Sequence, residues 1–223
     1  ERVLSTQNHE IAGLVIEPLM QGAAGMVQSS HTYLRNVREL TRQYNVLMIV
    51  DEVATGFGRT GAMFACQKVG IEPDILCLAK GISGGYLPLA ATVTTESIFE
   101  AFLGKYSDNR TFFHGHTYTA NPLACAAGIA SLEIFDKEQT LKKLQPKIKQ
   151  LTEGLASIAS LEWVAEVRQE GFMVGIELMG FNPSQRMGTN VALEATRRGV
   201  FLRPLGDVIV LIPPLSITPK ELY

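Results

Sequence analysis

Apolar residues in the first two thirds of the chain form short continuous runs separated by helical patterns. The runs predict buried strands at residues 11–16, 46–50 and 75–78, and a weaker strand at residues 89–94. Apolar positions at helical spacing predict an amphipathic helix from about 31 to 45. Continuous apolar runs are typical of strands covered on both faces. The alternation of strands and helices predicts βαβ units, a mainly parallel sheet and the α/β class.

The pattern changes after about residue 136. Asn121 and Pro122 supply an N-cap and a first-turn proline for an Ala-rich helix at about 122–135. Helices are then expected at residues 137–158 and 188–198, and short strands at residues 163–168, 171–178, 200–203 and 208–212. This α+β order predicts a large domain at residues 1–136 and a smaller carboxyl-terminal domain at residues 137–223.

Composition and charge exclude several classes of protein. The 223 residues are 46% hydrophobic with a formal net charge of −2, which gives no reason to expect nucleic-acid or anionic-membrane binding. No apolar run approaches the ~20 residues needed to cross a bilayer. Cys66, Cys77 and Cys125 lack CxxC spacing, so a cytoplasmic location is expected, without disulfides or zinc. The chain starts without Met or a signal peptide, and we expect a piece of a longer protein with part of its site outside it.

Charged residues follow two of the predicted strands. Asp51 comes directly after the strand at residues 46–50, and Lys80 comes two residues after the strand at residues 75–78. In open α/β sheets, ligands bind at the carboxyl ends of the strands. A charge in such a place is costly unless it is paired or used. Either residue alone is as well explained by a structural ion pair or by an exposed loop charge.

The surroundings of these two residues favour cofactor chemistry. Lys80 is followed by small residues at 81–85, which leave room for a planar ligand beside an imine-forming amine. The carboxylate of Asp51 could hold a pyridine nitrogen protonated, and Val53 could lie against the ring face. The 29 residues that separate Asp51 from Lys80 are enough for one crossover between neighbouring parallel strands.

Three blocks of the sequence resemble the class III aminotransferases. They are residues 51–61 (DEVATGFGRTG), 78–85 (LAKGISGG) and 113–122 (FHGHTYTANP). The resemblance places the chain in the carboxyl-terminal part of the family's sequence and covers essentially all of it. It implies the fold of the fold type I pyridoxal-phosphate-dependent transferases, with pyridoxal 5′-phosphate as the cofactor. It also implies that Lys80 carries the cofactor and that Asp51 pairs with the pyridine nitrogen.

The resemblance assigns further residues. It places on Thr117 a contact with the phosphate of the neighbouring subunit's cofactor, which implies a homodimer. It places on Arg203 the binding of a substrate carboxylate, which suits a planar guanidinium. A surface arginine at a strand end is the alternative for Arg203. Gly115 would permit close approach of the backbone to a ligand and is counted among the substrate-binding residues.

Within the family, further segments are similar to the subgroup that acts in biotin biosynthesis. These are residues 17–25, 73–80, 86–92 and 203–214. The likeness implies small-molecule substrates: 8-amino-7-oxononanoate converted to 7,8-diaminononanoate, with S-adenosylmethionine or lysine as amino donor. Another class III activity stays open, such as ω-amino acid:pyruvate transamination or racemisation. An inactive homologue that serves as a binding module is a further alternative. The presence of both Asp51 and Lys80 argues against it.

Other patterns are set aside. Residues 56–61 spell GxGxxG, but a dinucleotide loop should directly follow its strand and open a helix, whereas two acidic residues intervene here. His114 and His116 form an HxH pair without a third ligand, so a hydrogen-bonding or positional role is expected rather than a metal site. Trp163, the only tryptophan, is expected in the core of the second domain.

Overall fold

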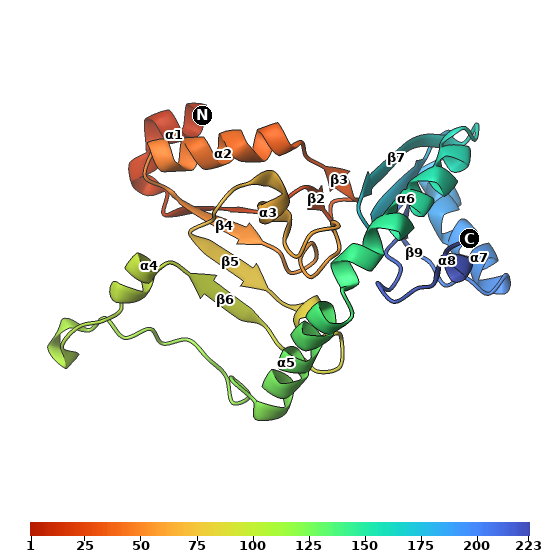
Figure 1. Cartoon of the computed structure of the whole chain (residues 1–223). Coiled ribbons are helices and arrows are strands. Elements are labelled where there is room, and N and C mark those ends of the chain that lie inside the picture. Colours follow the sequence, from red (N-terminus) through yellow and green to blue (C-terminus); the bar gives the residue numbers. More distant parts are fainter.

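The chain folds around two four-stranded sheets in the computed structural model, which describes residues 1–223 (Figure 1). The strand order is β1-β4-β5-β6 in the first sheet and β7-β8-β10-β9 in the second. The long helix α5 leads directly into α6, and this pair connects the two sheet-containing bodies (Figure 1). None of the helices combines the length and the apolar character that a membrane-spanning helix requires.

The secondary structure follows the predicted order closely. The helices are α1 (Arg2–Gln7), α2 (His31–Gln43), α3 (Ala65–Val69), α4 (Glu96–Glu100), α5 (Pro122–Lys137), α6 (Thr140–Ala159), α7 (Met187–Arg197) and α8 (Pro219–Leu222). The strands are β1 (Gly13–Ile16), β2 (Met20–Gln21), β3 (Val27–Gln28), β4 (Leu47–Asp51), β5 (Ile75–Leu78), β6 (Ala91–Thr94), β7 (Val164–Glu170), β8 (Met173–Leu178), β9 (Arg203–Leu205) and β10 (Val208–Leu211). Single 3-10 turns are η1 (Asn8–Glu10), η2 (Lys80–Ser83), η3 (Tyr106–Asp108) and η4 (Pro183–Gln185).

The first sheet is mainly parallel, as predicted. β1 pairs with β4 and β4 with β5 in parallel, whereas β6 pairs with β5 in the antiparallel direction. Its core lies on the side of α2 and α3, where residues such as Leu34, Met48 and Val69 pack together. The expectation that β1 is covered on both faces is wrong: Val15 is 66% exposed. β1 is an edge strand, and its side chains alternate between the core and the open face of the sheet.

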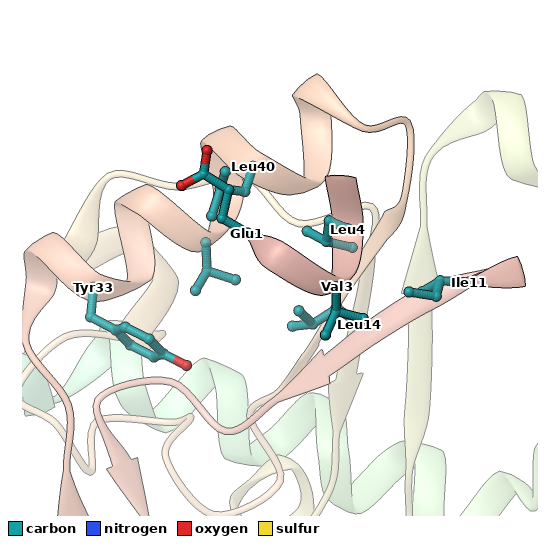
Figure 2. Close-up of a pocket in the computed structure, with 9 residues that line it drawn as sticks. Glu1, Val3, Leu4, Ile11, Leu14, Tyr33 and Leu40 are labelled. Carbon is teal, nitrogen blue, oxygen red and sulfur yellow. The ribbon is translucent and has the colours of Figure 1, made fainter. Parts of the chain in front are cut away.

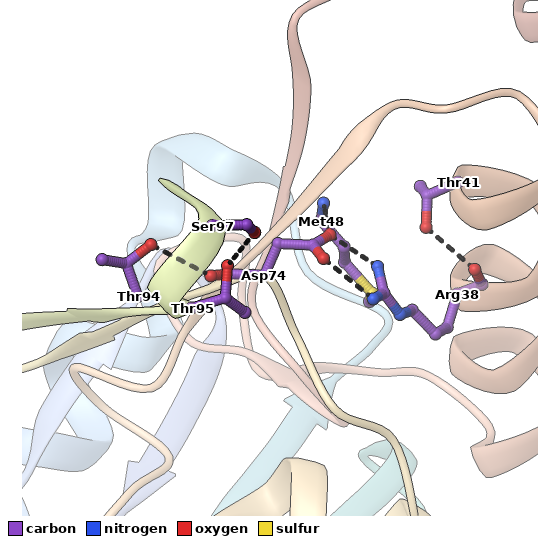
Figure 3. A network of polar contacts seen from close by, with 7 residues as sticks. All are labelled: Arg38, Thr41, Met48, Asp74, Thr94, Thr95 and Ser97. Carbon is purple, nitrogen blue, oxygen red and sulfur yellow. Dashed lines mark hydrogen bonds and ion pairs between the residues drawn. The ribbon is translucent and has the colours of Figure 1, made fainter. Parts of the chain in front are cut away.

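Asp74, just before β5, ties several elements together (Figure 3). Its carboxylate accepts two hydrogen bonds from the guanidinium of Arg38 in α2, at 2.6 and 2.9 Å, and one from the backbone N–H of Met48 in β4 at 2.7 Å. Its carbonyl oxygen accepts from Thr94 Oγ1 and from the Thr95 N–H at the end of β6. One residue thus fastens α2 to three neighbouring strands.

The second sheet is antiparallel throughout and packs on α6. Its core is formed by apolar residues of α6, β7, β8 and β10, with Phe172 fully buried. Trp163 was expected in this core, but it is 53% exposed and stacks on Phe181 with ring centroids 5.4 Å apart. The strand expected at residues 200–203 begins only at Arg203.

Five short features have no counterpart among the predicted elements: α1, α3, α4, α8 and the β2-β3 ribbon. Each is six residues or fewer, too short for a helical or alternating pattern to stand out. In contrast, the predicted N-cap of α5 is confirmed, because the Asn121 side chain accepts from the N–H groups of Leu123 and Ala124.

Candidate functional site

Asp51 and Lys80 lie at the carboxyl ends of two adjacent parallel strands. Asp51 is the last residue of β4 and stands opposite Cys77 of β5 in the sheet register. The Glu52 N–H donates to the Cys77 carbonyl at 3.0 Å, which extends the pairing one residue further. Lys80 then opens the turn η2 two residues after β5. The fold therefore brings together the two residues that the sequence placed 29 positions apart.

The backbone of Lys80 is in the left-handed conformation, with φ at +48°. This conformation costs a non-glycine residue about 1 kcal/mol or more and persists only where the surroundings enforce it. Strain of this kind concentrates at functional sites. The Lys80 side chain is exposed and forms no ion pair. The structural ion pair that the sequence left open for Lys80 is therefore absent.

The turn that carries Lys80 is held from several sides. The Ser83 hydroxyl donates to the Leu87 carbonyl at 2.6 Å and is almost fully buried. From α5, Ser131 Oγ reaches the Gly81 carbonyl at 3.4 Å. On the opposite side, Phe57 from the loop after β4 lies against Gly81. The Lys80 turn is thus packed between α5 and the loop that follows Asp51.

Asp51 keeps hydrogen-bonding capacity for a ligand. Its Oδ1 accepts from the Val53 N–H at 2.9 Å, and no other hydrogen bond or ion pair involves the carboxylate. Burial first, and the charge of Asp51 second, raise the pKa of the neighbouring Cys77 thiol. A half-buried carboxylate with a free oxygen at a strand end can accept a hydrogen bond from a protonated ring nitrogen.

Glu52 is a buried residue of the site region to which the sequence interpretation gave no role. It is fully buried, and its two oxygens accept from the Cys66 N–H at 2.7 Å and from Thr55 Oγ1 at 2.8 Å. Burial and the nearby Glu52 charge raise the pKa of the Cys66 thiol to about 12. Glu52 therefore fixes the loop after Asp51 to the start of α3. The only sequence signal was a second carboxylate directly after an apolar strand.

The GxGxxG segment joins the two bodies instead of binding a nucleotide. Arg59 donates through Nη1 to the Pro213 carbonyl, and its own carbonyl accepts the Phe172 N–H at 2.8 Å. Gln145 of α6 donates to the Gly61 carbonyl at 2.9 Å. Burial lowers the pKa of the Arg59 guanidinium. The loop that starts at Asp51 thus also forms hydrogen bonds with the second body.

Thr117 and Gly115 share no hydrogen bond with Asp51 or Lys80 within the chain. They lie in an exposed segment between β6 and α5 that extends away from the sheet and returns to α5 along the lower side of Figure 1. Next to them, His116 Nδ1 accepts the Tyr118 N–H at 3.1 Å, in line with the hydrogen-bonding role expected for this histidine.

Arg203 lies in the second body, at the start of β9, opposite Val210 of β10. Its side chain is exposed and forms no ion pair. It is thus a guanidinium free to bind a carboxylate.

An apolar cavity of about 360 Å³ lies elsewhere, between α1, β1 and α2 (Figure 2). Leu4, Leu14 and Tyr33 are among the residues that line it. It opens near the amino-terminal part of β1, where Gly13 is in register with Leu47 at the start of β4. It is therefore remote from the carboxyl ends of the strands, where Asp51 and Lys80 lie.

The residues at the strand ends fit pyridoxal phosphate. A strained, exposed lysine can form an imine with an aldehyde, and the free oxygen of Asp51 suits a pyridinium N–H. Val53, half-buried two residues after Asp51, can lie against a flat ring. A carboxylate and a primary amine on neighbouring strands are the two groups that such a ring and its aldehyde require.

The comparison of sequences assigns the chain to a class of enzymes whose fold agrees with the mainly parallel sheet described above. The model of the family Aminotransferase class-III matches residues 1–223. The chain therefore belongs to the class-III aminotransferase family. Solved transaminases share its architecture, which confirms the expected fold type I.

Particular relatives are more informative. The adenosylmethionine-8-amino-7-oxononanoate aminotransferases of Nitratidesulfovibrio vulgaris and Geobacter sulfurreducens are 55% and 52% identical over the whole chain. The chain covers 42% and 51% of their lengths, so it spans about half of these curated relatives. The crystal structure of the Methanocaldococcus jannaschii enzyme of the same name superposes with a TM-score of 0.95 at 44% identity, covering 99% of this chain and 53% of that one. An omega-transaminase from Thermomicrobium roseum gives 0.92 at 34% identity, covering 99% and 50%.

Proposed function

We propose that the protein of which this chain forms part is a pyridoxal-phosphate-dependent aminotransferase of biotin biosynthesis. It converts 8-amino-7-oxononanoate to 7,8-diaminononanoate, with S-adenosylmethionine or lysine as the amino donor. The observation that carries the proposal is the 55% identity to the Nitratidesulfovibrio vulgaris enzyme of that name over the full chain. The strand-end pair of Asp51 and Lys80 supports it with the chemistry that such an enzyme needs.

Each residue of the strand-end pair has a distinct role in the proposal. When bound, the cofactor supplies an electron sink for the carbon from which a proton is removed. Lys80 is the residue that would hold the cofactor, through Nζ, and its amine would serve as the base that moves the proton at the substrate carbon. Asp51 accepts the hydrogen bond of the ring N–H and keeps that nitrogen protonated. Val53 packs on the ring face and limits its tilt.

The second body supplies the substrate carboxylate site. Arg203 is exposed and free of ion pairs, so its guanidinium can form two parallel hydrogen bonds with the carboxylate of the acceptor. We propose a large cofactor-binding domain at residues 1–136 and a small domain at residues 137–223. The separate hydrophobic cores on either side of the junction between α5 and α6 support this division.

We also propose a homodimer in which Thr117 binds the phosphate of the partner's cofactor and Gly115 lies close to the substrate. No hydrogen bond or ion pair joins the exposed segment that carries both residues to Asp51 or Lys80 of its own chain. Apolar side chains on α5 support an interface in the same region, since Leu123 is 71% and Ile129 59% exposed. A surface of this kind is typical of subunit contacts.

The test uses protein expressed from the complete gene. Pyridoxal phosphate is added, the absorbance of the lysine-bound cofactor is recorded, and product formation from 8-amino-7-oxononanoate is measured with S-adenosylmethionine, lysine or neither. Product with one donor, and loss of the bound chromophore in Lys80→Ala, are expected. Amination of pyruvate instead would indicate another class III reaction. A protein that takes up no cofactor would reject the enzyme altogether and favour the binding module.

A further inference from the structure

Phe57, in the loop between β4 and α3, combines burial with a strained backbone. It is only 4% exposed, and its φ is +55°. A bulky residue in the left-handed region is an outlier that the surrounding structure must enforce. Lys80, also left-handed, stands next to the residue that Phe57 touches. Phe57 therefore touches the residue next to a second strained residue, which belongs to a different loop.

The contact is between Phe57 and the backbone at Gly81. A Cβ added to Gly81 would lie 2.7 Å from Phe57 Cβ and 3.1 Å from two atoms of the ring. The φ of Gly81 is not in the left-handed region, so its backbone conformation is open to any residue. Glycine is required here for space alone. The side chain of Phe57 lies directly against the residue that follows Lys80.

Phe57 is itself held firmly. Its ring packs edge-on against Phe64, with centroids 5.5 Å apart and planes at 76°. The Gly56 N–H before it donates to the Glu52 carbonyl at 2.9 Å. Gly58 after it lies against Leu215 of the second body. The position of Phe57 is thus set by the same loop that begins at Asp51 and seats the second body.

We infer that Phe57 is a positioning residue for Lys80. By supporting the turn at Gly81, it holds the Lys80 backbone in its left-handed conformation and so fixes where the lysine side chain leaves the backbone relative to Asp51. This inference rests on the proposed function, in which Lys80 carries the cofactor, and deepens it by naming what holds that lysine in place. Phe57 touches neither cofactor nor substrate in this role.

The decisive variant is Gly81→Ala, in protein from the complete gene. The added methyl clashes with Phe57 and displaces the Lys80 turn without backbone strain of its own. The readout is the fraction of Lys80 trapped by borohydride as its cofactor adduct at limiting pyridoxal phosphate, measured by peptide mass. A decrease of about tenfold or more is expected, because small misplacements of reacting groups are costly. Gly70→Ala is the control: Gly70 has φ +74°, a Cβ added there would have no neighbour within 4 Å, and a change of less than about twofold is expected.

A second variant, Phe57→Leu, tests the same contact from its other side. Phe57→Leu takes away the ring and should also lower the trapped fraction, even if Gly81→Ala fails to fold. Since both changes act on one contact, the double variant should lose less than the two single effects combined. Unfolding midpoints measured alongside separate this from a general loss of stability.

The outcomes distinguish the two hypotheses. Normal trapping in both single variants, or strictly additive losses in the double variant, would overturn the role of Phe57 and leave the proposed function intact. Wild-type protein that traps no cofactor on Lys80 would overturn both.

Discussion

At the scale of single residues, the site region depends on a few side chains in costly states. Lys80 and Phe57 have left-handed backbones, and Glu52 is a fully buried carboxylate. A buried charge is tolerated only where hydrogen bonds satisfy it. Both oxygens of Glu52 meet this condition through the Cys66 N–H and the Thr55 hydroxyl. These residues give the loop after Asp51 one defined conformation.

Glu52 provides a test at this scale. Glu52→Ala leaves the Cys66 N–H and the Thr55 hydroxyl without partners and opens a cavity, so the free energy of unfolding should fall by about 3 kcal/mol or more. Glu52→Gln is the matched control. Its carbonyl oxygen can still accept from Cys66, and its NH2 can donate to Thr55, so a loss of about 1 kcal/mol or less is expected. Urea unfolding of both variants measures the difference, and equal losses would contradict this role of Glu52.

At the scale of elements, the first sheet depends on polar ties as well as on its apolar core. Asp74 binds α2, β4 and β6 through side-chain and backbone oxygens (Figure 3). Burial alone would raise the pKa of its carboxyl. The hydrogen bonds from Arg38 and Met48, with the charges of Arg38 and Arg42, outweigh burial and hold the pKa below its ordinary value. The ionised form is therefore the one that the fold stabilises.

The direction of this pKa change sets a pH dependence. Because the folded-state pKa is lowered, the contribution of Asp74 is complete above the unfolded-state pKa of about 4 and is lost as the pH falls through the folded-state value. Asp74→Asn should destabilise by about 3 kcal/mol at pH 7, and the gap from wild type should shrink towards pH 2. Urea midpoints at several pH values measure this.

An exposed ion pair serves as the comparison. Glu194→Gln removes the partner of Arg197 and Arg198, which are exposed at the carboxyl end of α7, and should change stability by less than about 0.5 kcal/mol. A gap for Asp74→Asn that stays constant with pH would show that the carboxylate charge is not the stabilising feature.

At the scale of the whole molecule, residues 56–61 and the β7-β8 hairpin form the joint between the two bodies. Gly171, in the hairpin turn, has φ +62°, and a Cβ there would lie 2.5 Å from the Arg59 carbonyl oxygen. Around this contact, Lys68 pairs with Glu170, and Arg168 donates to the carbonyls of Gly25 and Met26. Backbone contacts and charged side chains thus together hold the second body against the first.

Gly171→Ala tests the joint. The methyl meets backbone atoms that cannot move independently, so a loss of about 3 kcal/mol or more is expected. Gly199→Ala carries a similar left-handed strain, at φ +88°, but its added Cβ would have no neighbour within 4 Å, so it should lose only about 1 kcal/mol. Thermal or urea midpoints compare the two. Equal effects would mean that the contact with Arg59 contributes nothing.

The proposed dimer has a test of its own. Lys80→Ala and Thr117→Val proteins should each be nearly inactive, because each damages every site. In a hybrid dimer, one site combines the intact Lys80 and the intact Thr117 from different subunits. Mixing and refolding equal amounts should therefore restore about a quarter of wild-type activity. No recovery in hybrids verified by native mass spectrometry would show that Thr117 acts within its own chain.

Sequence reasoning was most accurate where the signal is local. The strand at residues 75–78 and the Asn121 cap of α5 were predicted correctly. An apolar run and a capping dipeptide can each be recognised within a few consecutive residues. It was wrong for Trp163 and for the open face of β1 at Val15, since an apolar side chain does not reveal whether another element covers it. For the site, it named both strand-end residues but not Phe57 or Glu52.

The sequence by itself determined the order of the longer helices and main strands, the α/β class, and the placement of Asp51 and Lys80 at strand ends. Periodicity and chain direction are properties of the sequence. Its motifs also identified the family. Only the tertiary structure decided that β6 runs antiparallel, that the GxGxxG loop seats the second body, and that Phe57 lies against Gly81 beside Lys80. Those facts depend on which distant segments meet, and contacts between distant segments are set by packing of the whole chain rather than by any local pattern.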